Sequence, residues 1–247
     1  MEFERFITLS RETPTLHLRD YATFRDSFLP LALNARLRAA RVLPDYRSSE
    51  HRSAAFLETH NAAWATFVEN LSRWEQARMS LQLPRHEHLF IAGWQFPGIP
   101  NLFQFAKQIN ALLLVSQEAE WLKPLKEAGC TLNIHDHDAS LQLKKNMQSG
   151  RIIAALLDHH HPGTRYQEAK LLGRTVKTPS GVLTLCIRYQ YQISFIAPRA
   201  NSIEIVETVK TAGMSEAELA QLYNYWLEAE ILRTPEQWLM WQAFPLH

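Results

Sequence analysis

Two clusters of ionisable side chains in this sequence could do chemistry. Residues 158–161, Asp-His-His-His, follow directly on a short apolar run, and residues 135–138, His-Asp-His-Asp, follow another. Imidazole and carboxylate groups are common ligands of zinc, and they are also the side chains that most often act as general bases. The two clusters therefore indicate either a metal centre or a site of proton transfer.

A metal centre is the weaker of these two interpretations. Neighbouring residues of an extended or turn backbone point in different directions, so three consecutive histidines cannot all face one ion. His135 and His137 would share a face, as would His159 and His161, which leaves a four-ligand site geometrically possible. The spacing matches no zinc signature, however, and solvated loop histidines are the simpler interpretation for most of them. We expect no bound metal and no cofactor.

Covalent catalysis by serine or cysteine is not indicated either. The chain has no G-x-S-x-G motif, and neither Cys130 nor Cys186 has a neighbouring base in the sequence. Cys186 lies in an apolar segment of helical character, which is typical of a buried, inert thiol. The two cysteines are far apart, and they predict a protein without disulfides from a reducing compartment.

Composition excludes further classes of function. The 247-residue chain has a formal net charge of +1, so no basic excess indicates a nucleic-acid partner. Its 8 glycines make a glycine-rich phosphate loop unexpected. No run of about 18 apolar residues is present, and charges interrupt the first residues of the chain. We expect a soluble, cytoplasmic protein with no integral membrane segment.

Short apolar runs alternate with helical intervals after Pro84. The apolar runs are 88–93, 111–115, 131–134 and 152–158, and the helical intervals are 101–109, 119–128 and 139–148. Alternation of this length is typical of βαβ units, and continuous apolar runs are typical of parallel strands covered on both faces. The sequence predicts an α/β fold with a mainly parallel central sheet flanked by helices.

Helical patterns dominate the N-terminal third. From Asp20 to about Leu81, apolar residues recur at spacings of three and four, which predicts a helical N-terminal extension over 1–83. Residues 84–247 form the predicted α/β core. No linker separates the two parts, so we expect a single domain.

Five more helices and strands are predicted in the last third. Residues 177–189 read as a turn followed by a helix, and 192–199 and 202–209 read as strands. The segment from Met214 onward predicts two closing helices, the first opened by a Ser215–Glu218 capping box.

Ligands of open α/β sheets bind outside the carboxyl ends of the strands. Three predicted strands end in polar or aromatic residues there: one runs into Trp94-Gln95, one into residues 135–138 and one into residues 158–165. If these strands are neighbours, five histidines and three aspartates lie along one rim of the sheet.

Three segments, in this order, resemble the late acyltransferases of lipid A biosynthesis, within the lysophospholipid acyltransferase superfamily. QSGRIIAALLDHHHPGTR is similar to the family's K-x-G-x-x-v-x-x-x-x-D-H/Q-D-x-G-x-R stretch. LLGRTVKTPSGVLTLCIRYQYQISFIAPR is similar to its FFG-x-p-a-x-T-x-x-G-x-x-x-LA-x-x-x-x-A-x-x-vP stretch. RTPEQWLMWQAF resembles its C-terminal PEQY-x-W-x-H-R-R-F. The three segments cover about 110 residues.

The resemblance implies an acyltransferase fold that moves an acyl chain from a carrier-protein or CoA thioester to a hydroxyl or amine. In the family the base is the histidine of an H-x-x-x-x-D/E motif placed after an early core strand. Trp94 and Ile99 occupy those two positions here, and neither side chain can accept a proton near neutral pH. No histidine of this chain has an acid five positions later.

Other positions match the family. Asp158 and Arg165 match its rim residues, and Arg165 would suit a phosphate or phosphopantetheine group unless it forms an ordinary surface ion pair. Thr178, Ser180 and Gly181 match a turn before a helix, whose N-terminus could receive an anion. A substrate-binding position is also expected for Trp94 and Gln95, which follow the early strand. The family's membrane helix and basic C-terminal ending are not matched, so lipid A is not the expected acceptor.

Three functions follow, in order of preference. The first is acyl transfer to a small-molecule amine or hydroxyl with a non-standard base, for which His135, His137, His159 and His160 are candidates beside Asp158. The second is a catalytically inactive module that binds an acyl chain, a carrier protein or a catalytic paralogue. A metal-dependent site is ranked last.

Overall fold

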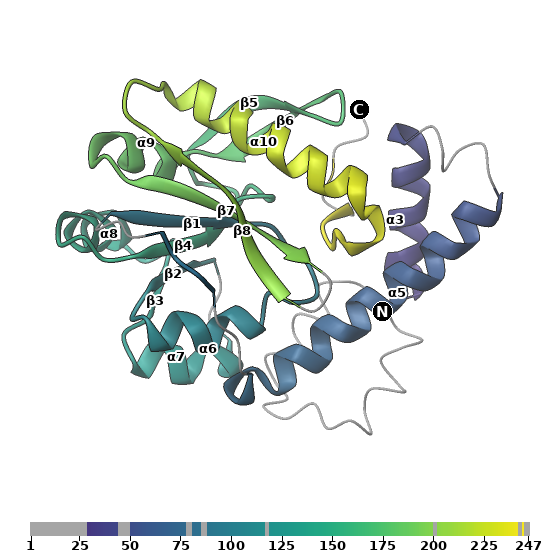
Figure 1. Ribbon diagram of the computed structural model, residues 1–247, viewed down its shortest axis with the longest axis horizontal. Helices are drawn as coiled ribbons and strands as arrows, with labels where there is room; N and C mark the ends of the chain where they lie inside the picture. The colour runs from purple at the N-terminus through teal and green to yellow at the C-terminus, as the bar shows by residue number, and fades with distance from the viewer. Residues whose placement is uncertain are drawn as a thin grey trace.

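The computed structural model describes residues 29–43, 50–77, 81–84, 88–116, 119–199, 202–241 and 244. Its centre is a six-stranded sheet with the order β3-β2-β4-β1-β7-β8 (Figure 1). The strands are β1 (Leu89–Gly93), β2 (Leu112–Val115), β3 (Thr131–Asn133), β4 (Ile153–Leu156), β7 (Gln192–Arg199) and β8 (Ser202–Lys210). All neighbours are parallel except β8, which runs antiparallel to β7. The predicted α/β fold with a mainly parallel sheet is confirmed.

Helices flank the sheet. They are α3 (Leu29–Val42), α5 (Glu50–Ser72), α6 (Asn101–Gln108), α7 (Lys123–Glu127), α8 (Ala139–Gln148), α9 (Gly181–Arg188) and α10 (Glu216–Arg233), with single 3-10 turns at η1 (Trp74–Gln76), η2 (Glu120–Leu122) and η3 (Pro235–Gln237). Figure 1 shows α10 on one side of the sheet and α6 and α7 on the other. In the described part of the chain, no helix is both long and apolar enough to cross a bilayer.

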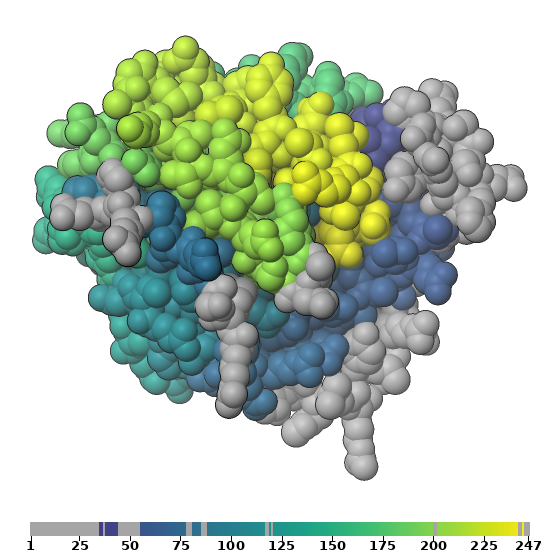
Figure 2. All heavy atoms as spheres, viewed as in Figure 1, coloured from purple at the N-terminus to yellow at the C-terminus, as the bar shows by residue number. Residues whose placement is uncertain are grey.

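The N-terminal helices α3 and α5 fall within the extension predicted to be helical, of which residues 1–28, 44–49 and 78–80 lie outside the described residues. The pair packs against the C-terminal segment rather than covering the whole sheet. His60 of α5 hydrogen-bonds to the carbonyl oxygen of Glu236 at 2.7 Å, and Phe56 packs edge-on against Trp241. Figure 2 shows the yellow C-terminal atoms lying directly against the blue atoms of α5.

Burial explains why the apolar runs form the sheet. All five residues of β1 are buried, because β4 and β7 flank the strand and helices cover both faces. Removal of such side chains from water is the main favourable term in folding. β1 is therefore central, and residues just beyond its end, including Trp94 and Phe96, are fully buried too.

A β-hairpin that the sequence analysis did not predict stands apart from the central sheet. Its strands, β5 (Tyr166–Leu171) and β6 (Arg174–Pro179), pair antiparallel over their whole length. The predicted turn over 177–180 is therefore partly wrong, because its first three residues belong to β6, whereas the helix that follows is present as α9. The alternation of buried and exposed residues along β5 and β6 was the available signal.

The hairpin turn depends on Leu172 and Gly173, which have φ angles of 50° and 72°. We expect Gly173→Ala to lower the free energy of unfolding by about 1 kcal/mol, because an L-residue in the left-handed region is strained. The added Cβ would meet nothing within 4 Å, so the effect is conformational. Urea denaturation measures it.

Gly181→Ala is the matched control for that substitution. Gly181 begins α9 without a positive φ, and its added Cβ would lie 3.8 Å from the Cβ of Arg165. The control is expected to be neutral or slightly stabilising, since alanine favours the helix. Equal losses of stability in the two variants would contradict the conformational explanation.

The C-terminal segment corrects a second prediction. The Ser215–Glu218 capping box opens α10 as expected, but the predicted last helix is only the single turn η3. Trp238 and Trp241 are both buried, and the backbone N–H of Leu239 donates to the carbonyl oxygen of Gln95 at 3.0 Å. Tertiary packing of these tryptophans, together with a backbone bond to the end of β1, overrides the helical pattern.

Candidate functional site

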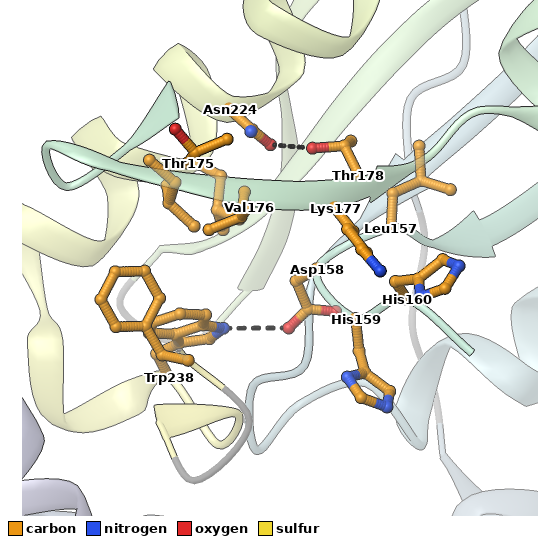
Figure 3. Close-up of a pocket in the computed structure, with 13 residues that line it drawn as sticks. Leu157, Asp158, His159, His160, Thr175, Val176, Lys177, Thr178, Asn224 and Trp238 are labelled. Atoms are coloured by element: carbon orange, nitrogen blue, oxygen red, sulfur yellow. Dashed lines mark hydrogen bonds between the residues drawn. The ribbon is translucent and has the colours of Figure 1, made fainter. Parts of the chain in front are cut away.

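A cavity of about 320 Å³ opens between the β5–β6 hairpin, α10 and the loop that follows β4 (Figure 3). Its polar lining consists of Asp158, His159, His160, Thr175, Lys177, Thr178 and Asn224. Leucine, valine and aromatic side chains form the remaining walls. Four of these polar residues were predicted from the sequence, and the cavity is the place where the structure brings them together.

Asp158 is the most constrained acid of the cavity. Its Oδ2 accepts hydrogen bonds from the backbone N–H of Gln95 at 2.9 Å and from the indole Nε1–H of Trp238 at 3.0 Å. Its other oxygen, Oδ1, is buried and has no hydrogen-bond partner among the described residues. The residue as a whole is partly exposed, so solvent reaches other atoms of Asp158 but not this oxygen.

Burial raises the pKa of Asp158 from 3.8 to about 6. The hydrogen bonds from Gln95 and Trp238 lower the pKa, but their effect is smaller than that of burial. A carboxylate that is ionised at neutral pH, holds a fixed orientation and keeps one free oxygen is suited to accept a proton.

The hydroxyl of Tyr223 links α10 to the central sheet. It donates to the carbonyl oxygen of Gly93 at 2.9 Å, which joins α10 to the end of β1. Burial raises the pKa of Tyr223, and the nearby charge of Asp158 raises it further. Tyr223 therefore stays protonated and acts as a fixed support.

Thr178 and Asn224 form a buried polar pair on another wall. The Thr178 hydroxyl donates to Oδ1 of Asn224 at 3.1 Å. The sequence predicted Thr178 for a turn, but it lies on β6 with its side chain buried. Asn224 comes from the middle of α10 and was not predicted.

Lys177 and His160 both contact the ring of Tyr166. The Nζ of Lys177 is 4.6 Å from the centroid of the Tyr166 ring, and the His160 ring is 4.9 Å from it in an edge-on contact. His160 Nε2 is 3.1 Å from the carbonyl oxygen of Thr164, to which it donates. With that nitrogen occupied, His160 has a structural role within its loop.

His135, His159 and His161 form a second group beside the cavity. The His159 and His161 rings are 4.8 Å apart, and the His135 and His161 rings are 6.2 Å apart. Burial, together with the smaller effect of the neighbouring histidines, lowers the pKa of His161 to about 4. Burial also lowers the pKa of His159. His137, by contrast, is exposed on the turn after β3.

This group does not resemble a metal centre. Among the described residues, no three or more His, Cys, Asp or Glu side chains converge in a way that would hold a metal ion. Strand order explains why the two clusters meet only partly, because β2 lies between β3 and β4.

Trp94, which the expected resemblance aligned with a catalytic histidine, is fully buried and packs against Phe96 with ring centroids 5.1 Å apart. Ile99, in the position of the family's acid, is also buried. Neither residue lines the cavity. Gln95 takes part through its backbone N–H, which holds Asp158, rather than through its side chain.

Three further predicted residues lie outside the cavity, at the start of α9. Arg165 forms a two-pronged ion pair with Glu216, with Nε–Oε1 and Nη2–Oε2 distances of 3.1 and 2.6 Å. Ser180 is buried, and its backbone N–H donates to the carbonyl oxygen of Arg165. Gly181 is the first residue of the helix. Arg165 is thus engaged by an acid of its own chain.

Among the polar residues of the cavity, Thr175, Lys177 and Asn224 were not predicted, and the role of Trp238 was missed as well. Asn224 is a polar residue on the buried side of α10, between Tyr223 and Leu227, and that position was the available signal. Trp238 was predicted only as a packing residue, but its indole N–H donates a hydrogen bond to Asp158.

No protein-family model matches this sequence, and no curated protein matches it either. The function is therefore inferred from the cavity and from the residues that line it.

Proposed function

We propose that this protein transfers an acyl group from a carrier-protein or CoA thioester to an amine or hydroxyl, with Asp158 as the base. The observation that carries the proposal is the carboxylate of Asp158. One of its oxygens is held by two N–H donors, the other is buried and has no hydrogen-bond partner among the described residues, and the residue lines the cavity. The similarity of the sequence around Asp158, Thr178 and Trp238 to acyltransferase motifs supports the choice of reaction.

The reaction balances without a cofactor. Oδ1 of Asp158 accepts the proton of the acceptor's O–H or N–H as that oxygen or nitrogen bonds to the thioester carbonyl carbon. The carbon–sulfur bond then breaks, and the thiolate leaves with the proton returned from Asp158. The products are an ester or amide and a free thiol, and the carboxylate is regenerated. Proton transfer of this kind contributes typically about 10²–10⁴-fold to a rate.

This base stands at a different strand end from the base of the family. The family's histidine would follow β1, where Trp94 is fully buried. Asp158 follows the neighbouring strand β4, and the hydrogen bond from Gln95 ties the two strand ends together. An amine acceptor suits a weak base of this kind, because it needs less proton removal than a hydroxyl does. Lys177, exposed and part of the cavity lining, is placed to attract the phosphate groups of the donor.

Thioester turnover tests the proposal. The protein is incubated with acetyl-, octanoyl- and palmitoyl-CoA, and with the corresponding acyl carrier proteins, in the presence of primary amines or alcohols. Release of thiol and formation of amide or ester are measured together. We expect Asp158→Asn to lower the turnover number at least a hundredfold, in line with loss of a general base.

Asp136→Asn is the matched control, because Asp136 is an exposed carboxylate on the turn after β3. It is expected to leave turnover unchanged. Absence of turnover in the wild-type protein with every donor and acceptor would reject the proposal, as would an Asp158→Asn variant with wild-type activity.

The second candidate function is a catalytically inactive module that binds an acyl chain, a carrier protein or a catalytic paralogue. The burial of both Trp94 and Ile99 favours it, because the family's base and acid are replaced by core residues. Saturable binding of an acyl-CoA without thiol release, unaffected by Asp158→Asn, is the result that would select this function.

A further inference from the structure

A second polar group of the cavity is left without a partner. Asn224 is 1% exposed and lines the cavity. Its Oδ1 accepts the hydrogen bond from Thr178, whereas its Nδ2 has no hydrogen-bond partner among the described residues. A buried donor left unpaired lowers the stability of a protein. The protein thus maintains an amide N–H group in this cavity at the expense of its own stability.

The unpaired groups of Asn224 and Asp158 are complementary. Nδ2 of Asn224 can only donate a hydrogen bond, and the ionised Oδ1 of Asp158 can only accept one. Both side chains line the same cavity, from α10 and from the loop after β4 (Figure 3). A ligand that satisfies both presents one acceptor and one donor. The carbonyl oxygen of a thioester and the N–H or O–H of the attacking acceptor are such a pair.

We infer that Nδ2 of Asn224 binds the thioester carbonyl oxygen and stabilises the oxyanion that forms from it. This inference rests on the proposed acyl transfer. As the acceptor bonds to the carbonyl carbon, the carbonyl π electrons move onto the oxygen, and they return when the carbon–sulfur bond breaks. A fixed N–H donor in a buried site stabilises that transient charge more than it stabilises the uncharged carbonyl.

Thr178 is the positioning residue for this amide. An asparagine amide can rotate so that either its oxygen or its nitrogen faces a given side. In the structure the Thr178 hydroxyl donates to Oδ1 and holds the amide in place, with Nδ2 left without a partner among the described residues. Thr178 is 1% exposed, so water does not compete for this bond.

Three variants test the inference with octanoyl-CoA as donor and hexylamine as acceptor. Asn224→Leu removes the donor at similar volume, and we expect kcat to fall about 10²–10³-fold, as for loss of one oxyanion donor. KM is expected to change much less than kcat. Thr178→Val is expected to lower kcat about fivefold, again with little change in KM, since one hydrogen bond corresponds to about 1 kcal/mol.

Thr66→Val is the matched control, at an exposed position of α5 that does not line the cavity. The Thr66 hydroxyl donates to the carbonyl oxygen of Ala62 in the same helix, at 3.0 Å, so its loss is expected to leave kcat unchanged. If Asn224→Leu does not fold, Thr178→Val tests the inference in its place. A fall in kcat with little change in KM supports the role of Asn224, and an unchanged kcat contradicts it.

The possible results separate this inference from the proposed function. If the wild-type protein turns over, Asp158→Asn does not, and both Asn224→Leu and Thr178→Val retain wild-type kcat, the role of Asn224 is overturned and acyl transfer stands. If the wild-type protein itself releases no thiol in the full donor and acceptor panel, acyl transfer and the role of Asn224 are both overturned.

Discussion

The Asp158→Asn variant is expected to be more stable than the wild-type protein at pH 8, by about 2–3 kcal/mol. The reason is the raised pKa of Asp158, about 6 in the folded protein against 3.8 ordinarily. Below pH 3.8 the folded and unfolded states both hold this proton, and the group contributes its full stability. As the pH rises through 6, folding must bury an ionised carboxylate, and that stability is lost.

Asparagine removes this charge while keeping an oxygen for the N–H groups of Gln95 and Trp238. The stability difference between the variant and the wild type should therefore shrink as the pH falls from 8 towards 4. Urea denaturation at several pH values measures it. Asp136→Asn, at an exposed position, is expected to show no such trend.

The combination of higher stability with lost turnover is what distinguishes a functional acid from a structural one. A structural acid would be stabilised by its partners, and its removal would destabilise the protein at neutral pH. A variant that is less stable than the wild type at pH 8 would therefore contradict the role given to Asp158. Active-site residues commonly lower stability in this way.

Acidification from pH 6.5 to 4 is expected to lower the free energy of unfolding by about 3 kcal/mol through His60 alone. His60 is fully buried between α5 and the C-terminal segment, and burial lowers its pKa from 6.5 to about 4. Its Nδ1–H donates to the carbonyl oxygen of Glu236 at 2.7 Å. A second proton would have to sit on Nε2, which has no hydrogen-bond partner among the described residues.

The direction of this pH effect follows from which state, folded or unfolded, binds the proton. Between pH 6.5 and 4 the unfolded chain protonates His60 and the folded protein does not, so falling pH favours unfolding. The contribution is fully present above pH 6.5 and is lost as the pH falls towards 4. His159 and His161, whose pKa values are also lowered, act in the same direction.

His60→Gln tests this, because glutamine still has an N–H group to donate to Glu236 but does not titrate. Its stability should fall less between pH 6.5 and 4 than that of the wild type. Asp158 acts in the opposite direction over part of this range, so both proteins are best compared in the Asp158→Asn background. His137→Gln, at an exposed site, serves as control. An unchanged pH dependence in His60→Gln would show that burial does not hold this imidazole neutral.

The sequence by itself determined the fold class and the strands of the central sheet. Apolar runs and helical intervals are local patterns, and each predicted run of the core corresponds to a strand, from β1 (Leu89–Gly93) to β8 (Ser202–Lys210). The same patterns placed Asp158 just beyond the carboxyl end of a strand, where ligands of such sheets bind. The hairpin was missed although its alternation is also local, and the last helix was overpredicted.

Only the tertiary structure decided which of the polar residues act together. Strand order placed β2 between β3 and β4, which separated His137 from the cavity, and it placed β1 beside β4, which brought the backbone of Gln95 to Asp158. Trp238 reaches the same carboxylate from 80 residues further along the chain, and Asn224 lines the same cavity from α10. These contacts join distant segments through the order of strands and the packing of helices, and the periodicity of a single segment does not encode them.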